Sequence, residues 1–300
     1  MTKCKAPHVG FFSSHQGTGL CPASEPQNVS PMEFWNGSIQ QEVRTAMANN
    51  QEHDLCRNCY HAERKGDASF RNIYNSQHKD LSQKDLPQWL DLDWSNFCNL
   101  KCVMCGPSRS STWAKETGDY TETNHVRLAS QRRIDEVYQL SSTNLRSLNL
   151  EGGEPSMMKE YDDYLQYLID IGASKNCKVS IVTNLTNINK QFYKRLEDFE
   201  EIGLCVSIDA HGTANEFTRY PSKFKIIDRN LRWVAETPFG ATITIAFQVT
   251  TLFNIDKFLH WLYDVQQYFE QHGKRLQIRT QLVNYPTQLH VRHAPFKLKQ

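Results

Sequence analysis

The 300-residue sequence contains no apolar run approaching the roughly 18 residues of a membrane span, and its N-terminus lacks the apolar region of a secretory signal. We therefore expect a cytoplasmic protein with no membrane partner. An excess of charge of one sign is also missing. The formal net charge is +1, which gives no specific signal for nucleic acid. The apolar content of 39% is sufficient for a substantial core.

Cysteine is plentiful, with nine residues of which seven precede residue 106. In a chain without a secretory signal this usage favours metal ligation over disulfides. Cys98, Cys102 and Cys105 form a C-x3-C-x2-C spacing directly after a strand-like run. A structural zinc site closes all four ligand positions, whereas three cysteines on an iron–sulfur cube leave one iron open for chemistry. Cys177 and Cys205 lie in later strand-like runs, and we interpret both as buried, inert thiols.

The C-x3-C-x2-C spacing resembles the signature of the radical S-adenosylmethionine (SAM) enzymes. The resemblance implies a [4Fe–4S] cluster on Cys98, Cys102 and Cys105, with its fourth iron chelated by the amino and carboxylate groups of SAM. Met104 stands where the family often has an aromatic residue near the adenine. Methionine is apolar and adaptable, so this departure from the family pattern is a small one.

From residue 89 onward, short apolar runs alternate with patterns of three-and-four spacing, which are typical of strands followed by helices. Six such alternations predict parallel pairing with right-handed crossovers. We expect an α/β fold, a partial (β/α)6 barrel, which is also the core fold of the resembled family. Little room is left after the sixth strand for a covering helix. The expected strands are residues 89–94, 146–151, 178–183, 204–209, 241–250 and 276–283, and the apolar positions of the expected helices are Tyr161, Tyr164, Leu165, Leu168, Ile169, Phe192, Leu196, Phe199, Phe258, Leu259, Leu262, Val265 and Phe269.

The first part of the chain has a different character. It is polar and rich in turn residues, with one clear helix expected over residues 39–49. A charged stretch with almost no apolar side chains follows, as in a linker or a surface crossing. We therefore expect a small irregular cysteine-rich domain at residues 1–80, a linker at residues 81–88 and the barrel at residues 89–300.

The second expected strand ends in Gly152, Gly153, Glu154 and Pro155. Two glycines let the backbone approach a ligand closely. On its own this sequence is a common turn. One strand–helix unit after the cysteine loop, it matches the resembled family's Gly-Gly-Glu-Pro motif. The match implies that Glu154 and the freed backbone carbonyls accept hydrogen bonds from the SAM amino group.

The ends of the third and fourth strands offer further candidates. Asn184 either hydrogen-bonds the SAM ribose or caps the turn. Ser207 and Arg219 keep the twelve-residue spacing with which a serine and an arginine hold the SAM carboxylate in some members of the resembled family. The arginine fork suits a carboxylate, although a lone arginine after a strand is usually a surface residue. Ala210 replaces the glycine that usually follows in those members.

Cys4, Cys21, Cys56 and Cys59 form a second constellation, in which the last two make a C-x2-C at the start of a helix-like segment. Four cysteines close all corners of an iron–sulfur cube or of a zinc tetrahedron, and the spacing serves both. This segment resembles the twitch domain, the short relative of the SPASM domain, which implies an auxiliary [4Fe–4S] cluster. In the family that domain usually follows the barrel, whereas here it precedes it. The alternative ligands are His8, His53, His61 and His78.

By resemblance, the expected function is reductive cleavage of SAM to a 5′-deoxyadenosyl radical, which takes a hydrogen atom from the substrate. The implied partners are SAM, the substrate and an external one-electron reductant of the flavodoxin or ferredoxin type. The twitch resemblance favours modification of a peptide or protein. Oxidation of a small molecule of the aminocyclitol or nucleotide type is an alternative. A second alternative is a non-catalytic iron–sulfur or zinc protein, for binding or electron transfer on a degenerate barrel. No residue is singled out as a catalytic acid or base.

Overall fold

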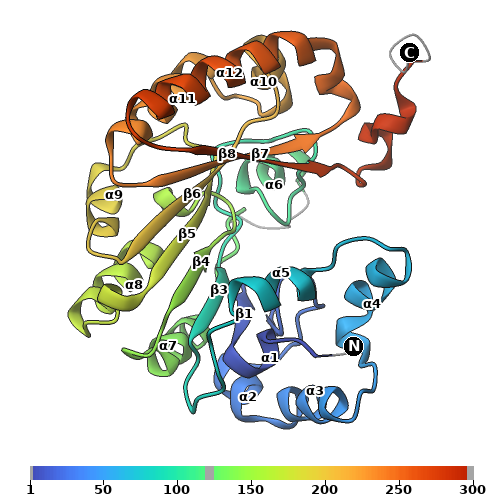
Figure 1. Ribbon diagram of the computed structural model, residues 1–300, viewed down its shortest axis with the longest axis vertical. Helices are drawn as coiled ribbons and strands as arrows, with labels where there is room; N and C mark the ends of the chain where they lie inside the picture. The colour runs from blue at the N-terminus through green and yellow to red at the C-terminus, as the bar shows by residue number, and fades with distance from the viewer. Residues whose placement is uncertain (1–2, 119–124, 296–300) are drawn as a thin grey trace.

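The computed structural model describes residues 3–118 and 125–295. One eight-stranded sheet runs through it in the order β2-β1-β3-β4-β5-β6-β7-β8. Neighbouring strands are parallel, except β1 and β2, which pair antiparallel. Figure 1 shows the sheet as an open arc, with the N-terminal helices at one end and β8 at the other. The strands are β1 (Gly10–Ser14), β2 (Thr18–Gly19), β3 (Trp89–Asp93), β4 (Ser147–Leu150), β5 (Lys178–Thr183), β6 (Glu201–Ser207), β7 (Gly240–Phe247) and β8 (Leu276–Leu282).

Helices cover the outer side of this arc (Figure 1). Short polar residues start several of them, because their side chains accept a hydrogen bond from the amide three residues on, as Ser69, Ser110, Ser130 and Asn189 do. The helices are α1 (Ala6–Val9), α2 (Pro31–Asn36), α3 (Ser38–Ala48), α4 (Arg57–Arg64), α5 (Phe70–Gln77), α6 (Ser111–Thr117), α7 (Gln131–Leu140), α8 (Lys159–Asp170), α9 (Lys190–Leu196), α10 (Thr213–Thr218), α11 (Phe224–Glu236) and α12 (Ile255–Gln271).

The six predicted strands are confirmed as β3 to β8, and the expected helices are α8, α9 and α12. Their predicted apolar positions are buried or half-buried with one exception: the prediction for Leu259 was wrong, because its side chain is 57% exposed. The buried stripe of α12 runs through Phe258, Leu262 and Val265. A residue one position away from such a stripe points about 100° from it, toward solvent.

The first 80 residues are more regular than the sequence predicted. They contain β1, β2 and five helices, and the helix expected over residues 39–49 is confirmed as α3. β1 pairs parallel to β3, with Phe11 opposite Leu90, so this segment extends the sheet beyond the six predicted strands. All five residues of β1 are buried, and three of them are glycine or serine. In a short strand that is buried on both faces, apolar and polar residues do not alternate, so its sequence gives no strand signal.

The expected linker packs against the N-terminal segment. The backbone amide of Gln88 donates to the Val9 carbonyl at 2.7 Å, and the Trp35 indole donates to the Asp85 carbonyl at 2.7 Å. Lys5 Nζ donates to the carbonyl oxygen of Leu81, also at 2.7 Å. Residues 81–88 therefore connect the two parts of the chain while hydrogen-bonded to the first.

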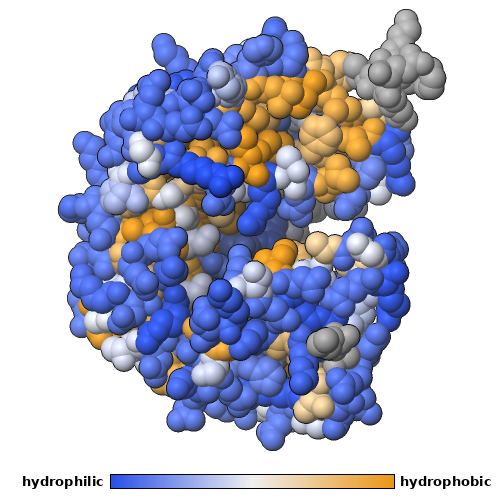
Figure 2. All heavy atoms as spheres, in the orientation of Figure 1, coloured by the Kyte–Doolittle hydropathy of each residue, from blue (hydrophilic) through white to orange (hydrophobic). Residues whose placement is uncertain are grey.

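The two faces of the sheet differ in chemistry. Leu90, Leu92 and Trp94 point to the helices and belong to the main hydrophobic core. Asp91 and Asp93 alternate with them and point to the inner face, since side chains of a strand alternate between its two sides. Figure 2 shows a hollow at the centre of the molecule with hydrophilic residues inside it. The polar inner face of the arc therefore borders open space.

Within residues 276–295, β8 is followed by two short 3-10 turns, Thr287–Leu289 and Val291–His293. Among the described residues, no helix has both the length and the apolar character needed to cross a membrane.

Candidate functional site

The cysteine loop leaves the carboxyl end of β3 and is held in place by the start of α6. The amide of Cys98 donates to the Ser111 hydroxyl at 3.1 Å, and the hydroxyl of Thr112 donates to the Cys98 carbonyl at 2.6 Å. The Trp113 indole donates to the Cys102 carbonyl at 2.8 Å. These three contacts, all from the first turn of α6, fix the backbone of the loop, so its thiols have defined positions. Met104, expected near the adenine of SAM, is half-buried in this loop.

The three thiols of the loop lie close enough to influence one another. Burial, and then the neighbouring thiols and Glu154, raise the pKa of Cys98 to about 12. Burial likewise raises the pKa of Cys102 to about 11 and that of Cys105, against the opposing effect of Arg219. Thiolates are the ligands that iron and zinc require, and a bound metal deprotonates a coordinating thiol outright. Three converging thiols that are not in disulfides fit a metal cluster.

The Gly-Gly-Glu-Pro motif is hydrogen-bonded directly to this loop. The Gly153 amide donates to the Ser95 carbonyl and the Glu154 amide to the Phe97 carbonyl, both at 2.8 Å. A Cβ at Gly153 would lie 2.0 Å from the Phe97 oxygen, and one at Gly152, which has φ of +108°, would lie 2.6 Å from the Ser95 oxygen. Only glycine permits this approach. The motif and the cysteine loop therefore form one unit.

The Glu154 side chain is buried and its carboxylate has protein donors. It accepts hydrogen bonds from the hydroxyls of Ser156 and Thr183 and from the amide of Asn184, each at 2.7 Å. Burial raises its pKa, and these donors oppose the rise. The carboxylate therefore joins the ends of β4 and β5. Pro155, next in the motif, is buried and begins a 3-10 turn, Pro155–Met157.

Asn184 also contacts the cysteine loop. Its side-chain amide donates to the Asn99 side-chain oxygen at 2.9 Å and lies 4.0 Å from the Cys98 sulfur. Its own oxygen accepts from the amide and the hydroxyl of Thr186. The Asn184 side chain therefore caps the turn after β5, and its amide group also contacts the cysteine loop.

Arg219 is almost fully buried and forms an ion pair that the sequence did not reveal. Its Nε lies 2.7 Å from Oδ2 of Asp209, and its Nη2 donates to Oδ1 of the same carboxylate at 2.9 Å. Its Nη1 lies 3.9 Å from the Cys102 sulfur. Burial lowers the pKa of Arg219, but Asp209 and Cys102 outweigh it, so the residue stays charged. Ser207 is half-buried and lies opposite Thr244 on β7.

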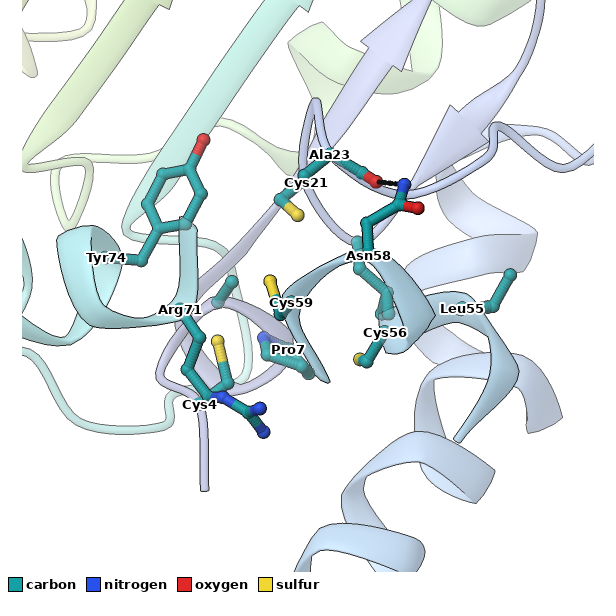
Figure 3. Close-up of a pocket in the computed structure, with 12 residues that line it drawn as sticks. Cys4, Pro7, Cys21, Ala23, Leu55, Cys56, Asn58, Cys59, Arg71 and Tyr74 are labelled. Atoms are coloured by element: carbon teal, nitrogen blue, oxygen red, sulfur yellow. Dashed lines mark hydrogen bonds between the residues drawn. The ribbon is translucent and has the colours of Figure 1, made fainter. Parts of the chain in front are cut away.

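Cys4, Cys21, Cys56 and Cys59, far apart in the sequence, line one cavity in the N-terminal segment. Figure 3 shows their side chains around a shared space, with Arg71 and Tyr74 beside them. Burial and the neighbouring thiols raise the pKa of Cys56 to about 12. Burial is also the main cause that raises the pKa of Cys4, to about 11, and that of Cys21. Four mutually interacting thiols in one cavity are a donor set for a metal cluster.

In the described part of the chain, the cavity is lined by cysteines and not by histidines. Among the described residues, none of His8, His53, His61 and His78 lines it, so none joins the four cysteines.

Arg71 is the residue of this cavity that sequence reasoning missed. Its side chain is 4% exposed, and its Nε donates to the Glu63 carboxylate at 2.9 Å. Its guanidinium also lies over the Tyr60 ring, 4.4 Å from the centroid. Burial lowers its pKa, but Glu63 more than compensates. No spacing in the sequence marks this residue.

A sequence model of the Radical SAM superfamily matches residues 92–262, which run from β3 into α12 and include the cysteine loop and the Gly-Gly-Glu-Pro motif. The chain belongs to the radical SAM superfamily. Members are enzymes that use a [4Fe–4S] cluster and SAM, and this radical SAM protein is an enzyme in that sense. Cys4, Cys21, Cys56 and Cys59 lie outside the matched residues.

Two relatives of this radical SAM chain are similar over part of its length. The mycofactocin maturase MftC of Mycolicibacterium smegmatis is 24% identical over 175 residues, which cover 58% of this chain and 40% of that protein. The mitochondrial GTP 3′,8-cyclase of Arabidopsis thaliana is 26% identical over 144 residues, which cover 48% and 32%. The alignments therefore span less than half of either relative.

Among solved structures, anSMEcpe with bound AdoMet is 18% identical with a TM-score of 0.45, over 64% of this chain and 50% of that one. Streptococcus suis SuiB bound to S-adenosylmethionine is 14% identical with a TM-score of 0.45, over 91% of this chain and 72% of that one.

Proposed function

We propose that the protein cleaves SAM reductively and uses the resulting 5′-deoxyadenosyl radical to take hydrogen from a peptide or protein substrate. The observation that carries this proposal is the docking of the Gly-Gly-Glu-Pro motif on the cysteine loop, through the hydrogen bonds of Gly153 and Glu154. This contact holds together the cysteine loop, proposed to bind the cluster, and the Gly-Gly-Glu-Pro motif, proposed to bind SAM. Both lie at the carboxyl ends of parallel strands, where such folds have their active sites.

The residues present fit a [4Fe–4S] cluster with one open iron, held by Cys98, Cys102 and Cys105. When bound, the cluster supplies the electron that breaks the C5′–S bond of SAM. Arg219 places a positive charge 3.9 Å from the Cys102 sulfur, which stabilises that sulfur as a thiolate. Asp209 orients Arg219 by accepting one hydrogen bond from Nη2 and by its ion-pair contact with Nε.

The SAM site in this proposal is built from Gly152, Gly153, Glu154, Pro155, Asn184, Ser207, Arg219 and Met104. In the described part of the chain, no backbone amide donates to the carbonyl oxygens of Gly152 and Gly153, which leaves them available to the SAM ammonium. The Glu154 carboxylate already accepts three hydrogen bonds of the roughly four it can accept. Its main contribution is to hold the motif and the Asn184 backbone in position.

We also propose a second, auxiliary [4Fe–4S] cluster on Cys4, Cys21, Cys56 and Cys59, in a twitch-like segment at residues 1–80. Support comes from the four thiols that line one cavity. When bound, such a cluster would supply either an electron acceptor for oxidation of the substrate or an anchor for it. Arg71 would place a positive charge beside it.

The choice of a peptide or protein substrate is supported by the relative named as a maturase. The second relative is named as a GTP 3′,8-cyclase, and it supports the alternative of a small nucleotide-type substrate. An external reductant of the flavodoxin or ferredoxin type completes the proposal.

Metal analysis after anaerobic reconstitution tests this assignment. We expect about eight irons with matching sulfide per chain, two cubes' worth, and about four after Cys98, Cys102 and Cys105 are changed together to Ala. Adding SAM to the reduced wild-type protein should change the EPR spectrum of its cluster, because SAM ligates the open iron. Cys205→Ser, on β6 and outside both cysteine sets, is the matched control. Zinc without sulfide, or an unchanged iron count in the triple variant, would contradict the proposal.

A further inference from the structure

Three carboxylates gather on the inner face of the sheet, at the carboxyl ends of β3 and β4. Asp91 and Asp93 are two residues apart on β3 and so point to the same face. Asn149 lies opposite Asp91 in the sheet and donates to its Oδ2 at 3.1 Å. Glu151, two residues beyond Asn149, continues the row just past the end of β4. The sequence pattern at these positions predicts a strand and assigns no role to the three carboxylates.

This row of carboxylates borders the Gly-Gly-Glu-Pro motif. Glu151 directly precedes Gly152, and a Cβ at Gly152 would lie 3.0 Å from Oδ1 of Asp93. A ligand group held by these carboxylates would therefore lie beside the motif of the proposed SAM site.

Positive charge does not balance these carboxylates. Arg109, from the loop after Cys105, forms an ion pair with Asp93. His15, after β1, lies 3.9 Å from Oδ1 of Asp93, but burial and the cations Arg109 and Arg127 lower its pKa against the pull of Asp93. Among the described residues, two guanidinium groups, Arg109 paired with Asp93 and Arg127 near His15, therefore lie close to three carboxylates.

The other titratable groups near this row include the Cys105 thiol, which interacts with Asp93, and two tyrosines. Burial, with the nearby carboxylates, raises the pKa of Tyr74 on α5 and of Tyr161 on α8, so both hydroxyls are neutral. The Tyr161 hydroxyl is also occupied, since it donates to the backbone carbonyls of Leu92 and Glu151. Neither tyrosine supplies a counter-charge.

One oxygen of the deepest carboxylate also lacks a hydrogen-bond partner among the described residues. Asp91 is 1% exposed, and within the described residues its Oδ1 has none. Buried polar atoms are nearly always hydrogen-bonded, so such an atom points to a partner outside the chain. Burial and mutual repulsion raise the pKa of Asp91, and burial followed by Asp93 raises that of Glu151. Glu151 is half-buried, which makes it the accessible member of the row.

We infer that Asp91, Asp93 and Glu151 form an anionic subsite that binds a cationic group of the substrate, a protonated amine or a guanidinium. The inference rests on the proposed function and specifies its substrate class. Arg109 shows that such a group can reach the row from outside, because its side chain is 52% exposed and still pairs with Asp93. In a peptide substrate the cation would be a lysine or arginine side chain, or the N-terminal amine.

Binding of two isosteric probes tests the subsite directly. Butylguanidinium and the neutral butylurea differ mainly in charge. Calorimetry with the reconstituted protein and SAM measures the affinity of the protein for each probe. We expect butylguanidinium to bind about tenfold more tightly or better, since hydrogen bonds to charged groups are the stronger ones. Glu151→Gln should remove most of this preference, whereas Glu42→Gln, on the exposed side of α3, should keep it. Equal binding of the two probes to the wild type would overturn the inference.

A second measurement needs no ligand. A carboxyl group whose pKa is raised in the folded state binds its proton more tightly there, so stability falls as pH rises from about 4 through the raised pKa. Asp91→Asn keeps the shape and removes the charge, so the variant should melt at a higher temperature than the wild type at pH 8 and respond less to pH. Identical pH profiles for the two proteins would contradict the subsite.

Failure of the inference and failure of the proposed function are distinguishable. Formation of 5′-deoxyadenosine by the wild type, without probe discrimination, would overturn the subsite alone. Discrimination between the probes by a protein that does not cleave SAM would support the anionic subsite and contradict the proposed function.

Discussion

The contact between Gly153 and the cysteine loop gives the sharpest prediction. In Gly153→Ala, the added Cβ would lie 2.0 Å from the Phe97 oxygen, a backbone atom that can move only with the loop. Separation of the two segments would break the hydrogen bonds from the amides of Gly153 and Glu154. At about 1 kcal/mol each, their loss lowers the free energy of unfolding by about 2 kcal/mol. For a chain of 300 residues, that corresponds to a fall in Tm of about 3 °C.

Calorimetric melting and SAM titration of the reconstituted protein measure both consequences. We expect Gly153→Ala to fold, to melt earlier and to bind SAM about tenfold less tightly or worse, because the carbonyls of the motif move from the cluster loop. Gly203→Ala is the matched control, since nothing lies within 4 Å of its added Cβ and its backbone is not in the positive-φ region. A Gly153→Ala variant with wild-type Tm and wild-type SAM affinity would refute the reasoning.

Two other predictions concern buried charge and the second cysteine set. Asp209→Asn leaves the Arg219 guanidinium buried without its carboxylate and should lower the free energy of unfolding by about 3–5 kcal/mol in denaturant titrations. Asp198→Asn, which disrupts an exposed ion pair, should cost about 1 kcal/mol or less, and equal losses for the two would contradict the buried pairing. Changing Cys56 and Cys59 together to Ser should remove about four irons, spare SAM cleavage and abolish substrate turnover. Retained turnover would make the auxiliary site purely structural.

Six strands and four of the helices, α3, α8, α9 and α12, were predictable because their signals are local. Short apolar runs gave β3 to β8, and the apolar repeat of α8 gave its buried face. β1 was missed because its residues, Gly10–Ser14, are all buried and mostly small or polar. Its identity as a strand depends on pairing with β3, nearly 80 residues later, which no local pattern reveals.

The candidate site was predictable where residue type and spacing define the chemistry. The cysteine loop and the Gly-Gly-Glu-Pro motif were found in this way, and the structure places them in hydrogen-bonded contact. The partner of Arg219 was not found, because Asp209 lies ten residues away across α10. Arg71 was missed for the same kind of reason, since only the folded chain brings it to the four cysteines.

The proposed cleavage of SAM depends most on an open iron in the cluster that Cys98, Cys102 and Cys105 would hold. The direct measurement is anaerobic incubation of the reconstituted protein with SAM and dithionite, with 5′-deoxyadenosine and methionine followed by mass spectrometry. We expect both products from the wild type and neither from Cys98→Ala. Absence of both products from wild-type protein with a spectroscopically intact cluster would contradict the proposed cleavage.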